Sequence, residues 1–169
     1  MDNKTYYKSL NVYGKTFNLK LIENDCVSNF INEQNRFYED NILENLSRFL
    51  PSGKLDVGLD IGANIGNHTI FFSKVMDFNA IYSFEPQKDV YEILDENIKL
   101  NNCSNVVSYN MGLSNTSSER YSISRYLPDN LGSTAFSRSD SGDFVFKKLD
   151  DVKIEGKIDF IKMDVEEME

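Results

Sequence analysis

The sequence predicts an α/β protein with a parallel sheet and flanking helices. Short apolar runs typical of buried strands recur along the chain, and segments of helical periodicity separate the first three of them. Strands that alternate with helices in this way form a parallel sheet with right-handed crossovers. The length of 169 residues suits a single domain.

The predicted fold is organised around the sequence VGLDIGANIGNHTIFF at residues 57–72. An apolar run at 57–61 predicts a strand, and Gly62 and Gly66 then enclose a turn that leads into a helix. Glycines let the backbone approach a ligand closely, and the start of a helix offers unpaired N–H groups. We therefore expect this turn to hold a small ligand. The apolar face of the helix is expected to consist of Ile65, Thr69, Phe72 and Met76.

The residues that follow the second predicted strand, at 80–84, indicate that the ligand is a nucleoside. It is followed by Glu85 and by Pro86, a residue suited to the first position of a helix. Glu85 lies 23 positions after Gly62 (85 − 62 = 23), close to the offset of roughly 20 residues at which nucleoside-binding folds place the acid that accepts ribose hydroxyls.

The spacing of the turn favours one class of nucleoside. Its pattern is Asp-x-Gly-x-x-x-Gly, which differs from the Gly-x-Gly-x-x-Gly of dinucleotide-binding proteins. Asp60 places a negative charge beside the turn, which is unfavourable for a phosphate. A cationic nucleoside such as S-adenosylmethionine fits better, because Asp60 could attract its ammonium or sulfonium group directly or through water.

Two further elements are expected before the first strand of the sheet. Alternating apolar residues predict a β-hairpin at 10–22, which we assign to an N-terminal extension at 1–30, ahead of the main domain at 31–169. Helical periodicity at 35–50 predicts a helix that covers the sheet and ends at Pro51-Ser52-Gly53. The packed stripe of that helix is expected to comprise Tyr38, Ile42, Leu46, Phe49 and Leu50.

A second amphipathic helix is predicted at 87–100 and a third strand at 106–109. Residues 111–156 then lose regular periodicity, apart from short alternating pieces at 121–124 and 144–147 that predict irregular strands. A long loop at the ligand-binding edge of a sheet is usually functional, so we expect substrate contacts from it; the alternative is a mobile surface insertion.

A fourth buried strand is predicted at 158–163, followed by Asp164, Glu166, Glu167 and Glu169 at what resembles the first turn of a helix. The last strand has no covering helix, so we expect this chain to be part of a longer protein or to be completed by a partner.

Composition excludes several classes of function. The chain has 18 basic and 27 acidic residues and a net charge of −9, so attraction to nucleic acid is not expected. Cys26 and Cys103 have neither metal-ligand nor redox spacing, so we assign no metal ligands and expect buried thiols in a reducing compartment. The sequence contains neither a signal peptide nor an apolar run long enough to span a bilayer, so we expect a cytoplasmic protein.

Several motifs resemble the FkbM family of S-adenosylmethionine-dependent methyltransferases. They are LDIGANIGNHTIFF, YSFEPQKDVYEILDENIKLNN, MGLSN, LDD at 149–151 and IDFIKMDVEEME, with Arg36-Phe37-Tyr38-Glu39 upstream and Asn130-Leu131-Gly132-Ser133 in the long loop. The resemblance covers the chain from about residue 30. It implies a Rossmann-like class I methyltransferase fold, incomplete at the C-terminus, and O-methylation of a hydroxyl on a sugar or another small metabolite.

The resemblance also implies roles for individual residues. It makes Asp60, Gly62, Asn64 and Gly66 the cofactor loop, Glu85 the ribose acceptor, and Asn110 and Met111 the edge beside the adenine. Asp164 and Glu166 are candidate catalytic residues that could contact the acceptor or a metal ion, or serve as helix caps. His68 could act as a base, or it could pack near the cofactor. The chain departs from the family at Glu167, where Gly is usual after Asp-Val-Glu.

Two other functions remain open on the sequence alone. One is a nicotinamide-dependent oxidoreductase on a similar open sheet, which the spacing of the turn disfavours. The other is a truncated or degenerate fold that keeps a nucleoside pocket and acts as a binding or assembly module. Oligomeric state cannot be predicted.

Overall fold

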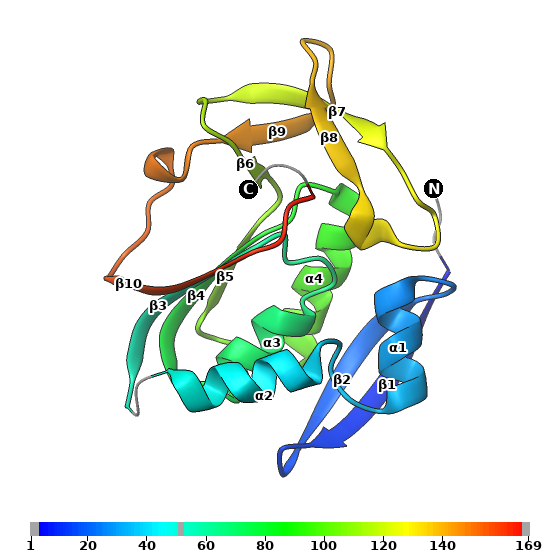
Figure 1. Ribbon diagram of the computed structural model, residues 1–169, viewed down its shortest axis with the longest axis vertical. Helices are drawn as coiled ribbons and strands as arrows, with labels where there is room; N and C mark the ends of the chain where they lie inside the picture. The colour runs from blue at the N-terminus through cyan, green and yellow to red at the C-terminus, as the bar shows by residue number, and fades with distance from the viewer. Residues whose placement is uncertain (1–3, 51–52, 167–169) are drawn as a thin grey trace.

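The computed structural model describes residues 4–50 and 53–166, which form two sheets, a hairpin and flanking helices (Figure 1). The central sheet is parallel, with the strand order β10-β3-β4-β5. Its strands are β3 (Leu55–Ile61), β4 (Phe78–Phe84), β5 (Val106–Tyr109) and β10 (Ile158–Met163). The helices are α1 (Cys26–Gln34), α2 (Asp40–Phe49), α3 (Asn67–Lys74) and α4 (Lys88–Leu100). The predicted α/β class and parallel sheet are confirmed.

The register of the central sheet brings the carboxyl ends of its strands to one edge. Ile61 of β3 pairs with Met163 of β10 on one side and with Phe84 of β4 on the other, and Phe84 pairs with Tyr109 of β5. Every strand therefore ends at the same level, where open α/β sheets bind their ligands. The turn after β3 and Glu85 after β4 lie at this level.

β10 lies at one margin of the sheet and is not the buried strand that the sequence predicts (Figure 1). Its side chains alternate, and Ile161 and Met163 are 47% and 48% exposed. β10 pairs only with β3 among the described strands, so its other edge is unpaired, and the face that carries Ile161 and Met163 is open to solvent. Residues 164–166 are not helical, and Glu167 and Glu169 lie outside the described residues.

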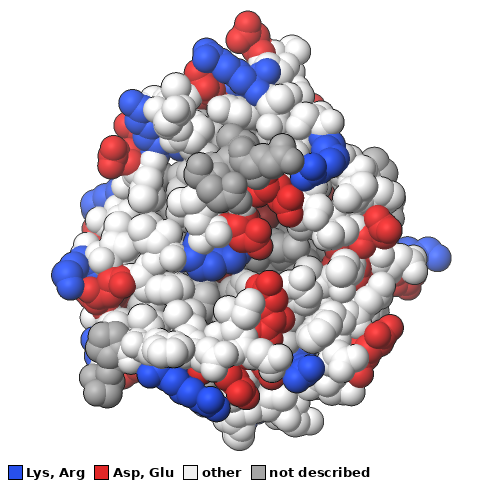
Figure 2. All heavy atoms as spheres, in the orientation of Figure 1, with Lys and Arg blue, Asp and Glu red and all other residues white. Residues whose placement is uncertain are grey.

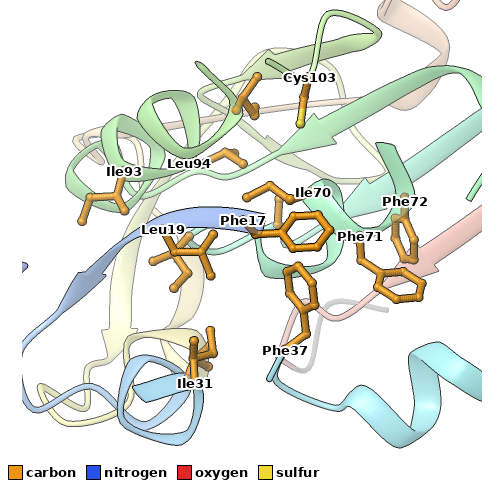
Figure 3. Packing of buried hydrophobic residues seen from close by; sticks show 14 of the residues in the cluster. Phe17, Leu19, Ile31, Phe37, Ile70, Phe71, Phe72, Ile93, Leu94 and Cys103 are labelled. Atoms are coloured by element: carbon orange, nitrogen blue, oxygen red, sulfur yellow. The ribbon is translucent and has the colours of Figure 1, made fainter. Parts of the chain in front are cut away.

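α3 is buried on all its sides. Residues 67–72 are all buried, which leaves no polar face, because the sheet lies on one side of the helix and the hairpin and α2 lie on the other (Figure 1). The expected stripe is therefore only partly helical: Ile65 belongs to the preceding turn and Met76 follows the helix. In Figure 3, Phe17 of the hairpin and Phe37 lie beside Phe71 of α3.

The predicted hairpin is confirmed and begins earlier than expected. β1 (Thr5–Val12) pairs antiparallel with β2 (Lys15–Ile22). The side chain of Asn97 in α4 accepts a hydrogen bond from Lys20 N at 2.6 Å and donates to Lys20 O at 3.0 Å. Asn101 makes the same pair of bonds with the backbone of Asn18. The hairpin is therefore fastened to α4 by two asparagines that imitate a neighbouring strand.

The helix predicted at 35–50 begins later, and its packed face differs. α2 starts at Asp40, because Asn35 and Glu39 have left-handed backbone with φ of 51° and 58°. Leu43 is the buried residue, whereas Ile42 is 60% and Phe49 86% exposed, so the predicted stripe was wrong at these two positions. The helix is capped by Leu50. Pro51 and Ser52, expected to terminate it, lie outside the described residues.

Residues 111–156 fold into a second sheet above the carboxyl edge of the central sheet (Figure 1). Both irregular strands that the sequence predicts are present within it. The strand order is β6-β9-β7-β8. A 3-10 turn at Leu131–Ser133 lies between β7 and β8, and a second one at Leu149–Asp151 lies between β9 and β10 of the central sheet. The strands are β6 (Gly112–Leu113), β7 (Glu119–Arg125), β8 (Ala135–Arg138) and β9 (Phe144–Lys147).

Candidate functional site

A pocket lies between the carboxyl edge of the central sheet and the second sheet. The space between its walls is about 570 Å³ when the open solvent at its mouth is included. Its wall combines the glycine turn, the segment after β4, β6, the segment at 131–136 and the end of β10. The lining residues are Ile61, Gly62, Asn64, Phe84, Glu85, Pro86, Gln87, Gly112, Leu113, Gly132, Thr134, Phe136, Phe146, Asp164, Val165 and Glu166.

Both glycines of the turn are required by close packing. Gly62 has a φ of +76°, and a Cβ there would lie 1.9 Å from the carbonyl oxygen of Asp164. Gly66 has a φ of +90°, and a Cβ there would lie 2.7 Å from Leu94 Cδ1 of α4. Gly62 therefore lets the turn meet the chain leaving β10, and Gly66 lets α3 approach α4.

The N–H groups of the turn are used within the protein. Those of Gly62 and Ala63 donate to Phe84 O, and that of Gly66 donates to Ala63 O. The N–H of Ile65 donates to the side chain of Asn64 at 2.7 Å, and the N–H of Asn64 donates to Glu85 Oε2 at 3.0 Å. The turn thus offers a ligand close backbone approach, but none of its own five N–H groups is unpaired.

Glu85 is held at the floor of the pocket. It is 4% exposed, and its two oxygens accept N–H groups from Asn64 at 3.0 Å and Gln87 at 2.9 Å. Burial raises the pKa of Glu85 to about 7, although both of these N–H bonds favour the charged form. Each carboxylate oxygen has a second lone pair, so Glu85 can still accept hydroxyl groups from a ligand.

Asp60 lies beneath the turn and does not line the pocket. Its Oδ2 accepts a hydrogen bond from Thr69 Oγ1 at 2.6 Å, and Thr69 is in turn 2.9 Å from Ser83 Oγ. Its Oδ1 has no aligned hydrogen-bond donor among the described residues, but it lies 3.2 Å from Lys162 Nζ. The charge that was expected to attract a cationic ligand is therefore paired with Lys162, and a direct role for Asp60 in binding stays a prediction.

Lys162 connects three parts of the site, and the sequence analysis did not identify it. Besides Asp60, its Nζ donates to Gly62 O at 2.7 Å and lies 3.8 Å from Asp164 Oδ2. It fixes the glycine turn against the end of β10. The available signal was a lysine near the end of β10, which lies opposite Asp60 of β3.

Asn110 and Met111 lie beside the pocket and not on its wall. Asn110 Nδ2 donates to Glu85 O at 2.9 Å and to Pro86 O at 3.1 Å, so it fixes the backbone that follows β4. Met111 packs in the smaller core cluster under the sheet. The neighbouring Gly112 and Leu113 line the pocket instead. The roles implied for Asn110 and Met111 therefore stay predictions.

Asp164 and Glu166 line the pocket at its β10 end. The side chain of Asp164 is 63% exposed. Glu166 Oε2 accepts a hydrogen bond from Arg125 Nη2 at 3.1 Å, which ties it to the second sheet. His68 is separate from this pocket: its Nε2 lies 3.3 Å from Glu39 Oε2, and the hydrogen bond from His68 lowers the pKa of Glu39. His68 and Glu39 line a different hollow, beside α2.

The segment at 129–136 covers the pocket and is anchored to the N-terminal part of the chain. Asp25 is fully buried, where its Oδ2 caps α1 through Ser28 N and its Oδ1 accepts Leu131 N at 3.2 Å. The N–H of Cys26 donates to Asp129 O at 2.8 Å. Asp25 and α1 were missed by the sequence analysis, although an acid three residues before Ser28 is a typical helix start.

Three further features concern nucleic-acid binding, metal binding and membrane insertion. Figure 2 shows acidic and basic side chains interspersed over one face, without a continuous basic patch. Across residues 4–50 and 53–166, no group of three or more His, Cys, Asp or Glu could hold a metal ion. No described helix is both long and apolar enough to cross a membrane.

Comparison with known proteins identifies a family. A family model described as "Methyltransferase FkbM domain" matches residues 60–169. No curated protein matches the chain. Solved structures similar to it include methyltransferase FkbM from Methylobacillus flagellatus KT, with 20% identity over 71% of this chain and 28% of that chain and a TM-score of 0.45.

Two other solved structures are similar over shorter spans. M. jannaschii TYW2 in complex with AdoMet has 26% identity over 64% of this chain and 44% of that chain, with a TM-score of 0.40. YcgJ from Bacillus subtilis has 19% identity over 41% of this chain and 29% of that chain, with a TM-score of 0.37. The chain spans less than half the length of each of these three structures.

Proposed function

The chain belongs to the methyltransferase FkbM domain family, and on this premise we propose that it binds S-adenosylmethionine and methylates a hydroxyl oxygen of a sugar or another small metabolite. The observation that carries the proposal is the position of Glu85 beside the glycine turn, at the carboxyl ends of two neighbouring parallel strands. The family match covers both features.

The residues of the pocket fit this cofactor. Glu85 keeps lone pairs for the two ribose hydroxyls, and Phe84, Gly112 and Leu113 offer an apolar wall for a base. No described lysine or arginine lines the pocket, and its charged side chains are the carboxylates of Glu85, Asp164 and Glu166. Such a wall favours a ligand that carries a positive charge over one that carries phosphates.

The chemistry of the proposed reaction requires little beyond orientation and a proton acceptor. When bound, the cofactor supplies an electrophilic methyl group. An acceptor hydroxyl must lie about 3 to 3.5 Å from that group and lose its proton as the new bond forms. Asp164 is the carboxylate we assign to this proton, because it is exposed at the β10 end of the pocket, whereas Glu166 is held by Arg125. The segment at 131–136 excludes water from the opposite wall.

The net charge of −9 supports a small acceptor over nucleic acid. We also propose a cytoplasmic location, which is supported by the absence of a disulfide between Cys26 and Cys103.

Isothermal titration with S-adenosylhomocysteine tests the proposal. We expect a single site, together with a rise in melting temperature of about 5 to 10 °C at a ligand concentration 100 times the Kd. NAD is the matched control and should give neither. A melting shift with NAD and none with S-adenosylhomocysteine would contradict the proposal and favour an oxidoreductase.

Methyl transfer is tested separately by mass spectrometry of a panel of sugar and metabolite hydroxyls. We expect the mass increase of one methyl substitution on at least one acceptor, and its loss in Asp164→Asn. Binding of S-adenosylhomocysteine without any methylated product would favour a binding module.

A further inference from the structure

Thr134 lines the pocket and has a buried hydroxyl group that lacks a hydrogen-bond partner among the described residues. The residue is 4% exposed and lines the pocket, and its Oγ1 has no hydrogen-bond partner in the part of the chain that the structure describes. Its backbone N–H, by contrast, is satisfied by Leu131 O at 3.2 Å. Buried polar groups are nearly always paired in folded proteins, so an unpaired hydroxyl at the wall of a pocket indicates a ligand contact.

The course of the chain places Thr134 at the β10 end of the pocket. Leu131 O accepts a hydrogen bond from Gln87 Nε2, on the β4 side. A Cβ at Gly132 would lie 2.9 Å from Asn64 Nδ2, above the turn after β3. Ser133 O accepts a hydrogen bond from Arg125, whose guanidinium also holds Glu166 after β10. The segment therefore crosses the pocket from β4 to β10.

The proposed cofactor would lie along the same line. If Glu85 binds the ribose at the end of β4, the methionine part extends over the turn after β3 toward β10, which is where Thr134 lies. This part of the cofactor carries an ammonium and a carboxylate. Glu166 provides negative charge for the ammonium, but the carboxylate needs a hydrogen-bond donor.

Few donors are available for that carboxylate. The five N–H groups of the turn from Gly62 to Gly66 are all paired within the protein, and no described basic side chain lines the pocket. Gln87 Nε2 donates one of its two hydrogens to Leu131 O, and the side-chain amide of Asn64 is a further donor on the wall. The hydroxyl of Thr134 is the buried polar group of the described wall that lacks a partner.

We propose that Thr134 Oγ1 donates a hydrogen bond to the carboxylate of the methionine part of S-adenosylmethionine. This inference rests on the proposed function and assigns a residue outside the glycine turn to cofactor recognition. Thr134 thereby distinguishes ligands that carry the amino acid from nucleosides that lack it.

The test compares two probes in isothermal titration: S-adenosylhomocysteine, and 5′-methylthioadenosine, which lacks the amino acid part. For Thr134→Val we expect S-adenosylhomocysteine to bind about 10- to 100-fold more weakly, the range for one hydrogen bond to a charged group, and 5′-methylthioadenosine to bind as in the wild type. Thr134→Ser keeps the hydroxyl and should retain most of the affinity. Thr16→Val makes the same chemical change on the exposed hairpin and should change neither affinity.

Thermal unfolding separates this role from a structural one. Valine replaces the unpaired hydroxyl with a methyl group of similar size, so the ligand-free variant should melt at or above the wild-type temperature. A lower melting temperature would indicate that the hydroxyl has a partner inside the protein and would overturn the inference. Unchanged S-adenosylhomocysteine binding by Thr134→Val, or equal losses for both probes, would also overturn it while leaving the proposed function intact. Failure of the wild-type protein to bind S-adenosylhomocysteine would instead remove both.

Discussion

Replacing Glu85 by Gln should remove a pH dependence of cofactor binding near neutrality. Burial raises the pKa of Glu85 from 4.5 to about 7, even though backbone N–H groups of Gln87 and Asn64 donate to its carboxylate. Ribose hydroxyls would donate to the same carboxylate, so the ionised form should bind the cofactor more tightly than the neutral form.

The magnitude follows from the fraction that is ionised. With a pKa of about 7, about one Glu85 side chain in ten is ionised near pH 6 and about nine in ten near pH 8. Because the apparent Kd is divided by the competent fraction, wild-type affinity for S-adenosylhomocysteine should rise about tenfold between these pH values.

Isothermal titration at several pH values between 6 and 8 measures this change. Glu85→Gln should bind about 1 to 3 kcal/mol more weakly near pH 8 and show a flat profile, because glutamine does not titrate. Glu92→Gln changes an exposed glutamate of α4 and should follow the wild type. A wild-type Kd that is constant across this range, or an equally steep profile in Glu85→Gln, would refute the reasoning.

Stability should show the opposite trend with pH. The folded protein binds a proton on Glu85 more tightly than the unfolded chain, so the free energy of unfolding is greatest below pH 4.5 for this group and falls as the pH rises to about 7. The difference is on the order of 3 kcal/mol. Urea unfolding of wild type and Glu85→Gln in parallel isolates it, and identical pH profiles would contradict the assignment.

Three further predictions concern the packing of the fold. Lys162→Met should lower the free energy of unfolding, measured in urea, by about 3 to 5 kcal/mol, because it leaves Asp60 buried without its counter-ion. Adding Asp60→Asn should recover most of this loss. Equal stability of the single and double variants would contradict the pairing of Asp60 with Lys162. Gly62→Ala should lower the free energy of unfolding by about 2 to 4 kcal/mol, because the new Cβ would overlap the carbonyl oxygen of Asp164 and the φ of Gly62 is +76°. Wild-type stability of this variant would mean that the turn does not lie so close to the end of β10. Leu43→Ala should lower the free energy of unfolding by about 2 to 5 kcal/mol because Leu43 is buried, whereas Ile42→Ala should lower it by less than about 0.5 kcal/mol because Ile42 is exposed. If Ile42→Ala melted at the lower temperature of the two, the packed face of α2 predicted from the sequence would be correct.

The sequence predicts the central sheet because each strand is a local signal. The apolar runs before Gly62 and Glu85 are short, bounded by turn residues and separated by a helical segment, so the parallel direction and adjacency of β3 and β4 follow from general rules of connection. The position of β10 beside β3 was not predicted. The juxtaposition of the turn with Glu85 follows from the same rules, since both come directly after neighbouring parallel strands.

Contacts between distant segments could not be predicted in this way. Asp25 binds the backbone of Leu131, 106 positions further along the chain, and no local pattern pairs these residues. The prediction of which face of α2 is packed was wrong for a related reason. Both Ile42 and Leu43 are apolar, and which of them is buried depends on where the helix begins, which the left-handed backbone at Glu39 decides.

The ion pair of Asp60 could not be predicted from the residues around the turn. Asp60 is correctly expected beside Gly62, but its partner Lys162 comes from a strand a hundred residues later. The hydroxyl of Thr134 likewise becomes distinctive only when its burial and lack of a partner are known.

A crystal structure of the protein with S-adenosylhomocysteine bound would test the central claim most directly. The ribose hydroxyls should lie within hydrogen-bond distance of Glu85, with the nucleoside across the ends of β3 and β4 and its amino acid part extending toward Thr134 and β10. A nucleoside bound elsewhere, or a ribose without contact to Glu85, would contradict the account.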